Sequence, residues 1–223
     1  MTPELPNQYI YTPPMEPYLT VIHEDEDIIV LDKPSGLLSV PGKPEELKDC
    51  LESRARECYP TASTIHRLDK DTSGVVVMAL NKWAHGRIGI QFEKRQTEKF
   101  YEARLWGLLE ADRGRVDLPL ATDWERKPRQ RVDFERGRPS QTDWEVLSRD
   151  GNTTRVKLMP ITGRTHQLRV HMLSLGHPIL GDPFYAEGEA LAAADRLQLH
   201  AEMLGFTHPR SGQWMEFLIP CPF

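Results

Sequence analysis

The stretch His66-Arg67-Leu68-Asp69-Lys70-Asp71-Thr72-Ser73-Gly74 leads directly into the apolar run Val75-Val76-Val77-Met78-Ala79-Leu80. This run is rich in β-branched residues and predicts a buried strand. Gly74 and the hydroxyl residues before it favour a tight turn where that strand begins. Because reactive groups are often placed on loops fixed to a rigid strand, Asp69 and its neighbour Arg67 are candidate functional residues.

Other readings of this loop are possible from its residues alone. It imitates the first half of an EF-hand, with oxygens at positions 1, 3 and 5 and glycine at position 6. However, Leu80 stands at the twelfth position, where a calcium loop needs a bidentate glutamate. Ser73 lies in no G-x-S-x-G elbow, and the chain contains no P-loop or G-x-G-x-x-G motif. Taken alone, the loop favours a turn in which Asp69 only hydrogen-bonds the backbone.

The composition is typical of a globular protein, and 223 residues are enough for a full hydrophobic core. The apolar runs are too short to cross a bilayer, and the Pro-rich residues 1–17 lack the features of a signal peptide. We expect residues 1–17 to form an extended arm and residues 18–223 to form one catalytic domain. Three cysteines without a C-x-x-C pair favour a cytoplasmic location with neither disulfides nor a zinc site.

The charge is distributed unevenly along the chain. The net charge of −5 argues at first against a nucleic-acid partner. Residues 1–32 contain seven acids and no Lys or Arg, however, so residues 33–223 carry a net charge of +2. Residues 151–181 contain no acid but four Lys or Arg, and residues 126–138 contain six basic residues. Such segments can attract a polyanion, or they can be ordinary solvated faces.

The pattern of apolar residues and turn formers predicts an α+β fold, because it does not alternate strictly between strand and helix. The expected strands are residues 19–22, 28–31, 75–80, 99–107, 142–147, 154–158, 197–206 and 214–219, with short ones near Val116 and Val132. The expected helices are residues 45–58, a segment from the N-cap Asn81 to about residue 95, residues 163–175 with Thr162 as N-cap, and residues 190–194.

Further motifs change the interpretation of the opening loop. They are Lys33-Pro34-x-Gly36-Leu37, Lys99-Phe100-Tyr101-x-Ala103, Thr162-Gly163-Arg164-x-His166-Gln167-Leu168-Arg169-x-His171 and Gly176-His177-Pro178-Ile179-x-Gly181-Asp182. Over about residues 19–220, the chain resembles the RluA family of pseudouridine synthases, and with no room for an added RNA-binding domain it is similar to the short members. The resemblance implies the pseudouridine synthase fold, a mixed and mainly antiparallel sheet with flanking helices and a central RNA-binding cleft.

The resemblance also implies roles for individual residues. The essential aspartate of the family, which acts at C1′ of the target uridine, corresponds to Asp69. Its carboxylate could attack C1′ as a nucleophile, or stabilise positive charge there and take the C2′ proton. Arg164 is expected to pair with Asp69 and keep it ionised, because burial alone would raise the pKa of this carboxyl. Tyr101 matches the tyrosine that contacts the uracil face, whereas Asp71 is a second carboxylate with no implied role.

The remaining expectations concern RNA. Arg67 is expected to enter the space left when the uridine is flipped out of a stem-loop. We expect His66, Ile161 and Arg169 to contact RNA nearby, with Ile161 as an apolar wall. The expected substrates are 23S rRNA, a tRNA anticodon stem-loop, or both, and the expected enzyme is a monomer without cofactor, metal or protein partner. The alternatives are an RNA-binding module with a vestigial site and a nucleoside hydrolase that releases free uracil.

Overall fold

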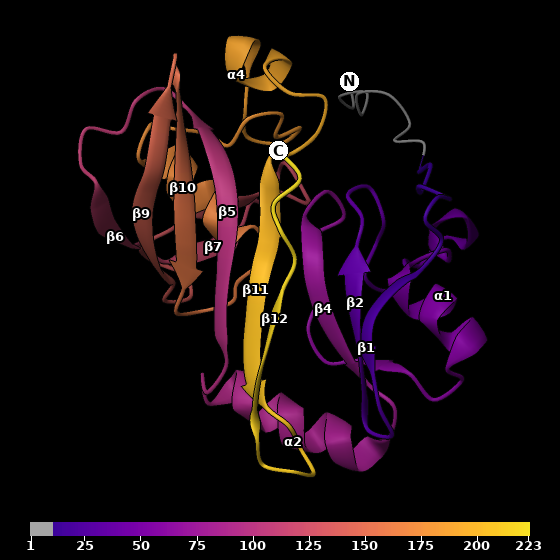
Figure 1. Ribbon diagram of the computed structural model, residues 1–223. Helices are drawn as coiled ribbons and strands as arrows, with labels where there is room; N and C mark the ends of the chain where they lie inside the picture. The colour runs from indigo at the N-terminus through magenta and orange to yellow at the C-terminus, as the bar shows by residue number, and fades with distance from the viewer. Residues whose placement is uncertain (1–10) are drawn as a thin grey trace.

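The computed structural model describes residues 11–223, in which β-strands are the main regular structure (Figure 1). The strands are β1 (Thr20–Glu24), β2 (Ile28–Lys33), β3 (Ser63–Thr64), β4 (Ser73–Ala79), β5 (Glu98–Trp106), β6 (Arg113–Asp117), β7 (Leu120–Thr122), β8 (Gln130–Val132), β9 (Gln141–Asp150), β10 (Thr153–Pro160), β11 (Leu199–Thr207) and β12 (Trp214–Leu218). Over these residues, one large sheet has the order β1-β2-β4-β11-β5-β10-β9-β6, while β7 and β8 form a separate hairpin.

The pairing confirms the predicted class. β12 lies beside β11, β3 lies beside β4, and β4 with β11 is the parallel pair in a sheet that is otherwise antiparallel. All seven residues of β4 are buried, which explains why its residues from Val75 to Ala79 are all apolar instead of alternating. The fold is therefore α+β with a mixed, mainly antiparallel sheet, and the strands expected from the sequence are present.

The helices agree with the sequence less well than the strands do. They are the 3₁₀ turn η1 (Glu45–Leu47) and the α-helices α1 (Leu51–Cys58), α2 (Lys82–Glu93), α3 (Gln167–Ser174) and α4 (Gly188–Ala192). Asn81 caps α2 as predicted, because its Oδ1 accepts the Ala84 N–H at 2.8 Å. The predicted continuous helix over residues 45–58 is wrong: Ser53 Oγ accepts the Cys50 N–H at 2.9 Å, and this capping starts α1 only after Cys50.

The start of α3 is also later than predicted. Thr162 does not cap a helix at this point; its hydroxyl donates to Gln167 Oε1 at 2.7 Å. The same amide oxygen accepts the Arg164 N–H at 3.1 Å. His166 then adopts a left-handed conformation, with φ 53°, immediately before the helix. The side chain of Gln167 therefore holds residues 162–166 as a loop, and Arg164 belongs to this loop instead of the first helical turn.

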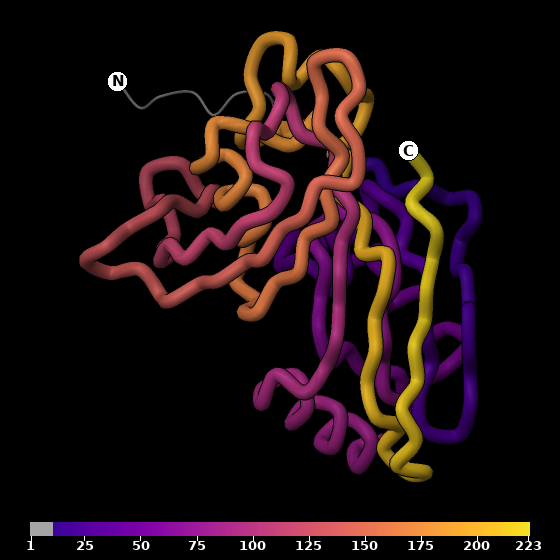
Figure 2. The backbone as a smooth tube through the Cα atoms, turned by 60° about the vertical axis from the view of Figure 1, so that its left-hand side comes forward, coloured from indigo at the N-terminus to yellow at the C-terminus, as the bar shows by residue number. Residues whose placement is uncertain are grey.

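The sheet carries two hydrophobic cores. One contains β2, β4 and α1, and the other contains β5, β10 and α3. β11 contributes residues to both cores, and Tyr101 of β5 packs against both. Figure 2 shows the two ends of the sheet turned away from each other, with β11 and β5 running between them. The cores therefore meet along the centre of the sheet.

The loop that opened the sequence analysis is fixed at this junction. In the parallel pair, Ser73 lies opposite His200 and Gly74 opposite Ala201. Gly74 has φ +114°, and a Cβ at this position would lie 2.2 Å from the Ala201 carbonyl oxygen. Only glycine fits such a close approach with a positive φ. The entry to β4 is thus fixed by contact with a strand more than 120 residues later in the chain.

The predicted N-terminal arm is only partly open to comparison, since residues 1–10 lie outside the described residues. Residues 11–17 have no helix or strand, but Tyr11 donates to the Asp49 carbonyl at 2.9 Å and accepts the Leu38 N–H at 3.0 Å. This part of the segment therefore packs against the loop before α1. None of the helices in residues 11–223 has the length and apolar character needed to cross a membrane.

Candidate active site

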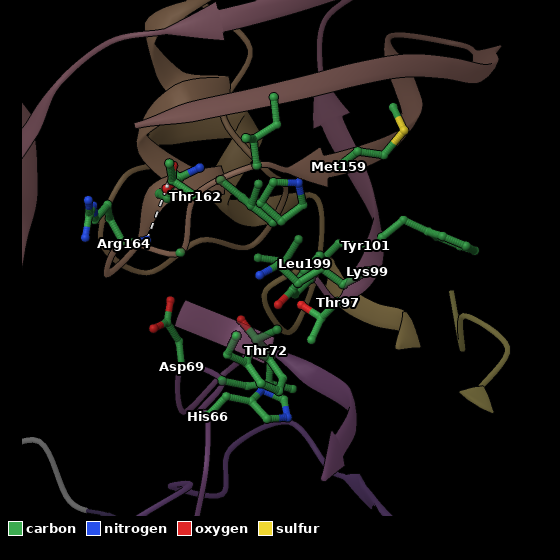
Figure 3. A pocket seen from close by; sticks show the side chains of 18 of the residues that line it. His66, Asp69, Thr72, Thr97, Lys99, Tyr101, Met159, Thr162, Arg164 and Leu199 are labelled. Atoms are coloured by element: carbon green, nitrogen blue, oxygen red, sulfur yellow. Dashed lines mark hydrogen bonds between the residues drawn. The ribbon is translucent and has the colours of Figure 1, made fainter. Parts of the chain in front are cut away.

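A cavity of about 960 Å³ opens beside the junction of the two cores (Figure 3). It is lined by the loop before β4, the end of α2, the start of β5, the β10–α3 loop and parts of α3 and β11. Segments from both halves of the chain thus face one space. The volume is within the range of small-molecule sites and is sufficient for a nucleotide extruded from a stem-loop.

Asp69 lies in this cavity with 28% of its side chain exposed. The backbone on both sides of it is held by buried polar groups. The ammonium of Lys33 donates to the Lys70 carbonyl at 2.9 Å, and Ser39 Oγ donates to the Leu68 carbonyl at 2.7 Å. Fixing both neighbouring peptide units restricts where the Asp69 carboxylate can point.

Lys33 opens the motif Lys33-Pro34-x-Gly36-Leu37, but the motif did not reveal that its side chain supports the loop of Asp69. Its side chain is fully buried, and its ammonium also donates to the carbonyls of Pro34 at 2.8 Å and Leu37 at 2.6 Å. Desolvation lowers the pKa of Lys33 to about 7, against the opposing charges of Asp71 and Asp69. A lysine two residues after the apolar run of residues 28–31 is the signal that could have identified this role.

The cation that pairs with Asp69 is Arg169. Its Nη1 lies 3.3 Å from Asp69 Oδ2, while Nε and Nη2 donate to the two oxygens of Asp182 at 2.7 and 2.6 Å. Burial acts to lower the pKa of Arg169, but Asp182 and Asp69 outweigh it and raise the pKa. The side chain is 1% exposed, which leaves little surface for the direct RNA contact predicted for Arg169. Arg169 instead supplies a fixed positive charge behind Asp69.

Arg164 does not form the ion pair predicted for it. Within the described residues its guanidinium is within ion-pair distance of no carboxylate, and its Nε donates to the Pro139 carbonyl at 3.4 Å. Figure 3 shows its side chain pointing away from the centre of the cavity. Desolvation and the nearby charges of Arg138 and Arg95 lower the pKa of Arg164. The late start of α3 leaves Arg164 in the loop and directs Arg169 to Asp69.

Tyr101 comes from β5 and lines the same cavity as Asp69 (Figure 3). Burial, followed by the negative charge of Asp69, raises the pKa of the Tyr101 hydroxyl. The hydroxyl is therefore protonated at neutral pH and can donate a hydrogen bond. Its position between the two cores presents a rigid aromatic ring to whatever enters the cavity.

The other predicted contact residues all line the cavity, but they differ in exposure. Arg67 is exposed, whereas Ile161 is half-buried at the cavity wall. His66 accepts the Val77 N–H at 3.1 Å and stacks on Phe92 with a centroid distance of 4.5 Å. Burial lowers the pKa of His66 to about 3, so its ring is neutral. His66 thus braces β4 against α2 and offers RNA no charge.

His166 is a residue that the sequence placed in a motif without giving it a role. Its Nε2 lies 3.8 Å from Asp69 Oδ2, and its Nδ1 lies 2.7 Å from the hydroxyl of Tyr185. The side chain is buried. The motif did not show that His166 lies between Tyr185 and the carboxylate of Asp69, because Tyr185 belongs to a later loop.

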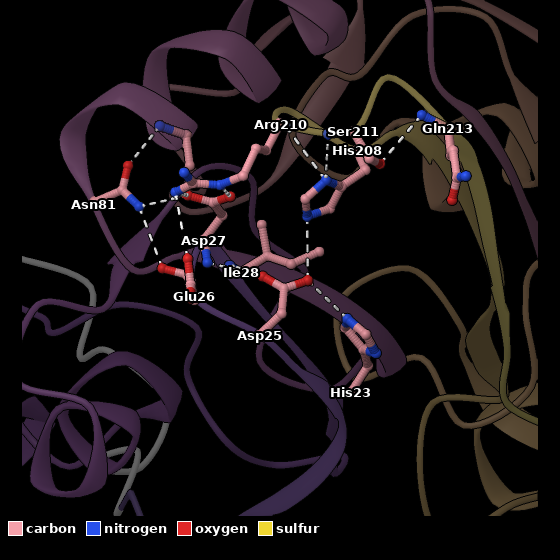
Figure 4. A network of polar contacts seen from close by, with 11 residues as sticks. His23, Asp25, Glu26, Asp27, Ile28, Asn81, His208, Arg210, Ser211 and Gln213 are labelled. Atoms are coloured by element: carbon pink, nitrogen blue, oxygen red, sulfur yellow. Dashed lines mark hydrogen bonds and ion pairs between the residues drawn. The ribbon is translucent and has the colours of Figure 1, made fainter.

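A group of residues outside the cavity brings possible metal ligands together. Asp25, Asp27 and His208 place ligand atoms within 4.8 Å of one another. These carboxylates already have partners (Figure 4): Arg210 donates to both oxygens of Asp27 at 2.6 and 2.7 Å, and Asp25 Oδ2 lies 2.9 Å from His23. We call these five residues the hairpin clasp. It ties the β1–β2 turn to the β11–β12 turn and does not resemble a metal site in need of a cation.

Comparison with known proteins identifies the family of this chain. The family model described as RNA pseudouridylate synthase matches residues 27–174. Two relatives named Dual-specificity RNA pseudouridine synthase RluA, from Pasteurella multocida (strain Pm70) and Escherichia coli (strain K12), are 53% and 54% identical. Each alignment covers 96% of this chain and 98% of the relative. The solved structure of Human RNA Pseudouridylate Synthase Domain Containing 1 has a TM-score of 0.76 at 30% identity, covering 98% of this chain and 87% of that chain.

The matches agree with the resemblance that the sequence motifs indicated. The family model alone spans most of the chain, including the loop before β4, β5 and all of α3. These are the segments that carry Asp69, Tyr101 and Arg169 into the cavity. The chain belongs to the RNA pseudouridylate synthase family and is an isomerase that converts uridine to pseudouridine in RNA.

Proposed function

We propose that this RNA pseudouridine synthase has dual specificity and modifies uridines in both 23S rRNA and a tRNA anticodon stem-loop. The proposal is supported by relatives of 53% and 54% identity that carry the description dual-specificity and are matched over 98% of their length. Sequence-specific RNA recognition mostly targets single-stranded loops, so two RNAs that present similar stem-loops can share one site. The cavity, with cationic residues at its edge, suits such a substrate.

Asp69 is the essential carboxylate in this proposal. The observation that carries it is the contact of its Oδ2 with Arg169, a buried cation that Asp182 holds from the other side. The arginine places a fixed positive charge against the Asp69 carboxylate when substrate excludes water. Oδ1 is then available either to attack C1′ or to take the C2′ proton, and both routes remain open. Tyr101 supplies the ring and the hydroxyl that face the uracil.

The RNA is held at the edge of the cavity. Arg67, which is exposed beside Asp69, fills the space left by the flipped uridine. Arg164, with Arg95 and Arg138 near it, offers a concentration of positive charge for phosphates. Arg164 therefore takes an RNA-binding role like the one expected of Arg169, and Arg169 takes the carboxylate-pairing role expected of Arg164.

We also propose that the protein acts as a cytoplasmic monomer. Every group assigned to the site comes from one chain, and the three cysteines are free, which suits a reducing compartment. Light scattering with and without stem-loop RNA measures the oligomeric state, and a stable dimer in either condition would contradict the proposal.

Tritium release provides the test of catalysis. Stem-loops from each proposed RNA carry tritium at uracil C5, and isomerisation releases this label. We expect Asp69→Asn to slow release from both RNAs by at least about 10²-fold. The matched control is Asp71→Asn, which removes a nearby carboxylate paired with Lys70 and should release label at nearly the wild-type rate.

Each alternative predicts a different product. Unchanged release by Asp69→Asn would remove Asp69 from the mechanism. Release from one RNA alone would contradict dual specificity but leave the catalytic assignment intact. Free uracil would indicate a hydrolase, and binding without release by the wild-type protein would indicate a vestigial site.

A further inference from the structure

His166 has two hydrogen-bonding directions, one toward the protein interior and one toward the cavity. On the interior side, its Nδ1 lies 2.7 Å from the Tyr185 hydroxyl. On the cavity side, its Nε2 lies 3.8 Å from Asp69 Oδ2. Its ring is fixed between these directions by stacking on Phe184, with a centroid distance of 5.6 Å, and by an edge contact with Tyr185.

The partners of Tyr185 determine which nitrogen of His166 carries the proton. The Gln130 backbone N–H donates to the Tyr185 hydroxyl oxygen at 2.8 Å. The hydroxyl proton of Tyr185 is then available for His166 Nδ1, which must accept it. If Nδ1 donated instead, Tyr185 would keep a buried hydroxyl proton without an acceptor, at a cost of about 1–3 kcal/mol. Nδ1 is therefore an acceptor.

The protonation states of both residues support this direction. Burial raises the pKa of Tyr185 to about 12, so its hydroxyl keeps its proton. Desolvation lowers the pKa of His166, so its ring is neutral at pH 7. A neutral ring with an accepting Nδ1 carries its proton on Nε2. The N–H of Nε2 faces the Asp69 carboxylate.

The electrostatic surroundings of His166 include charges from three segments. Asp69 and Asp71 face it from the loop before β4, Arg169 from α3, and Asp182 from the loop that follows. The carboxylates favour a protonated ring, whereas burial and Arg169 disfavour it. The latter effects prevail, since the pKa of His166 is lowered.

We propose that His166 is a positioning residue for Asp69 and that Tyr185 fixes the tautomer that allows it to act. The Nε2–H of His166 and Nη1 of Arg169 both point to the same oxygen of Asp69, Oδ2. Together they hold Oδ2 and direct Oδ1 toward the ribose. The 3.8 Å separation shortens to a hydrogen bond when RNA closes the site, as catalytic contacts do on substrate binding. This inference rests on the proposed role of Asp69.

Two substitutions of His166 separate this role from a merely structural one. In His166→Gln, the amide nitrogen occupies the place of Nε2 and can still donate to Asp69. In His166→Asn, the shorter side chain cannot reach it, although Asn tolerates the left-handed backbone of residue 166 well. We expect His166→Asn to lower kcat by about 10²-fold with KM unchanged, and His166→Gln to recover most of the rate. A backbone role predicts the opposite order.

The hydroxyl of Tyr185 is tested independently. Tyr185→Phe keeps the ring against His166 but removes the donor that fixes its tautomer, and we expect kcat to fall about tenfold with KM unchanged. Tyr59→Phe is the control, because it removes a hydroxyl that bonds Glu24 far from the cavity and should leave kcat unchanged. Thermal unfolding of each variant shows whether it is folded.

The pH profile completes the test. In the proposal, the His166 ring of the wild-type protein stays neutral during catalysis. Replacing it with glutamine, which does not titrate, should therefore leave the pH dependence of kcat unchanged from about pH 6 to 9. The inference would be overturned if the rise or fall of kcat with pH disappeared in His166→Gln. It would also be overturned if kcat fell equally in His166→Gln and His166→Asn. Asp69→Asn is measured in parallel, and full activity in that variant would overturn the proposed function itself. A pattern in which only Asp69→Asn is impaired would overturn the role of His166 alone.

Discussion

Arg169 and Arg210 each bind an aspartate through two hydrogen bonds, but the two pairs differ in which partners are buried. In the cavity, the Arg169 and Asp182 side chains are both inaccessible, with 1% and 0% exposed. In the hairpin clasp, Asp27 is 1% exposed, whereas the Arg210 side chain is 59% exposed. The geometry of the bonds is similar, with distances of 2.6 to 2.7 Å in both pairs.

This difference shows how one type of interaction serves two purposes. A buried arginine keeps its full charge away from solvent screening, and Arg169 has a third nitrogen left to contact Asp69. An exposed arginine is screened by water and acts mainly as a hydrogen-bonding partner for a buried carboxylate. The cavity pair therefore holds a charge against a neighbouring carboxylate, Asp69, whereas the hairpin clasp joins two turns.

Replacing Arg169 or Arg210 by lysine should give the largest difference in catalytic rate between the two pairs. Arg169→Lys keeps the positive charge, but a lysine ammonium cannot bond both oxygens of Asp182 and reach Asp69 at once. We expect tritium release by Arg169→Lys to fall by about 10²-fold, because Asp69 is no longer held. Arg210→Lys should release label at the wild-type rate. Equal rates in the two variants would show that the fixed geometry of Arg169 has no catalytic importance.

Neutralising Asp182, the buried partner of Arg169, tests the contribution of this carboxylate to the stability of the fold. Asp182→Asn leaves the buried charge of Arg169 with Asp69 alone, so we expect the free energy of unfolding to fall by about 3 kcal/mol. Asp143→Asn is the control, since Asp143 pairs with Arg115, which is 55% exposed. That change should cost less than about 1 kcal/mol. Urea unfolding measures both, and similar losses would contradict the distinction between the two settings.

Acid should weaken the hairpin clasp. The hydrogen bonds from Arg210 lower the pKa of Asp27, against an opposing effect of burial, and Asn81 adds to the lowering. A carboxyl with a lowered folded-state pKa adds stability above its unfolded pKa of about 3.9 and loses it as pH falls through the folded value.

The change that isolates this effect is Asp27→Asn. Below about pH 4 the variant should lose less stability than the wild-type protein does, and at pH 7 it should be less stable by about 1–2 kcal/mol. Urea unfolding across this pH range is the measurement. A variant with the same acid dependence as the wild type would show that Asp27 does not contribute.

Substitutions of Asn81 should cause the smallest loss of stability, and two different substitutions separate the contributions of its two contacts. Its Oδ1 caps α2, and its Nδ2 donates to Asp27 Oδ1 at 2.9 Å. Asn81→Ala should cost about 1 kcal/mol through loss of the cap. Asn81→Ser keeps a capping oxygen and removes only the donor to Asp27, so its smaller loss measures the link to the hairpin clasp. A loss in Asn81→Ser as large as in Asn81→Ala would assign the whole effect to that link.

Much of the fold could be predicted because its signals are local. The run from Val75 to Ala79 is apolar throughout, and β4 is buried along its length. Asn81 caps the next helix through a bond to a residue three positions away. The β1–β2 and β9–β10 hairpins form around turns whose residues are contiguous in the sequence. Such features depend on neighbours that the sequence shows directly.

The arrangement of the cavity could be predicted only in part. The motifs identified Asp69, Tyr101 and both arginines, but not which arginine meets a carboxylate 100 residues earlier in the chain. That choice depends on the side chain of Gln167, which delays the start of α3, and on Asp182, which anchors Arg169. These are tertiary contacts, and the spacing of residues within a motif does not contain them.

The position of β11 has a consequence for how the molecule is made. β11 comes late in the chain, yet it lies at the centre of the sheet, between β4 and β5. During synthesis, the N-terminal half can form its own contacts, but its junction with the second half must wait until residue 207 has left the ribosome. Gly74 can pair with Lys33 of β2 early, but its partner Ala201 on β11 is missing before then. A nascent chain on a translating ribosome, itself built of RNA, therefore carries no assembled catalytic cleft until nearly all of its described residues have emerged.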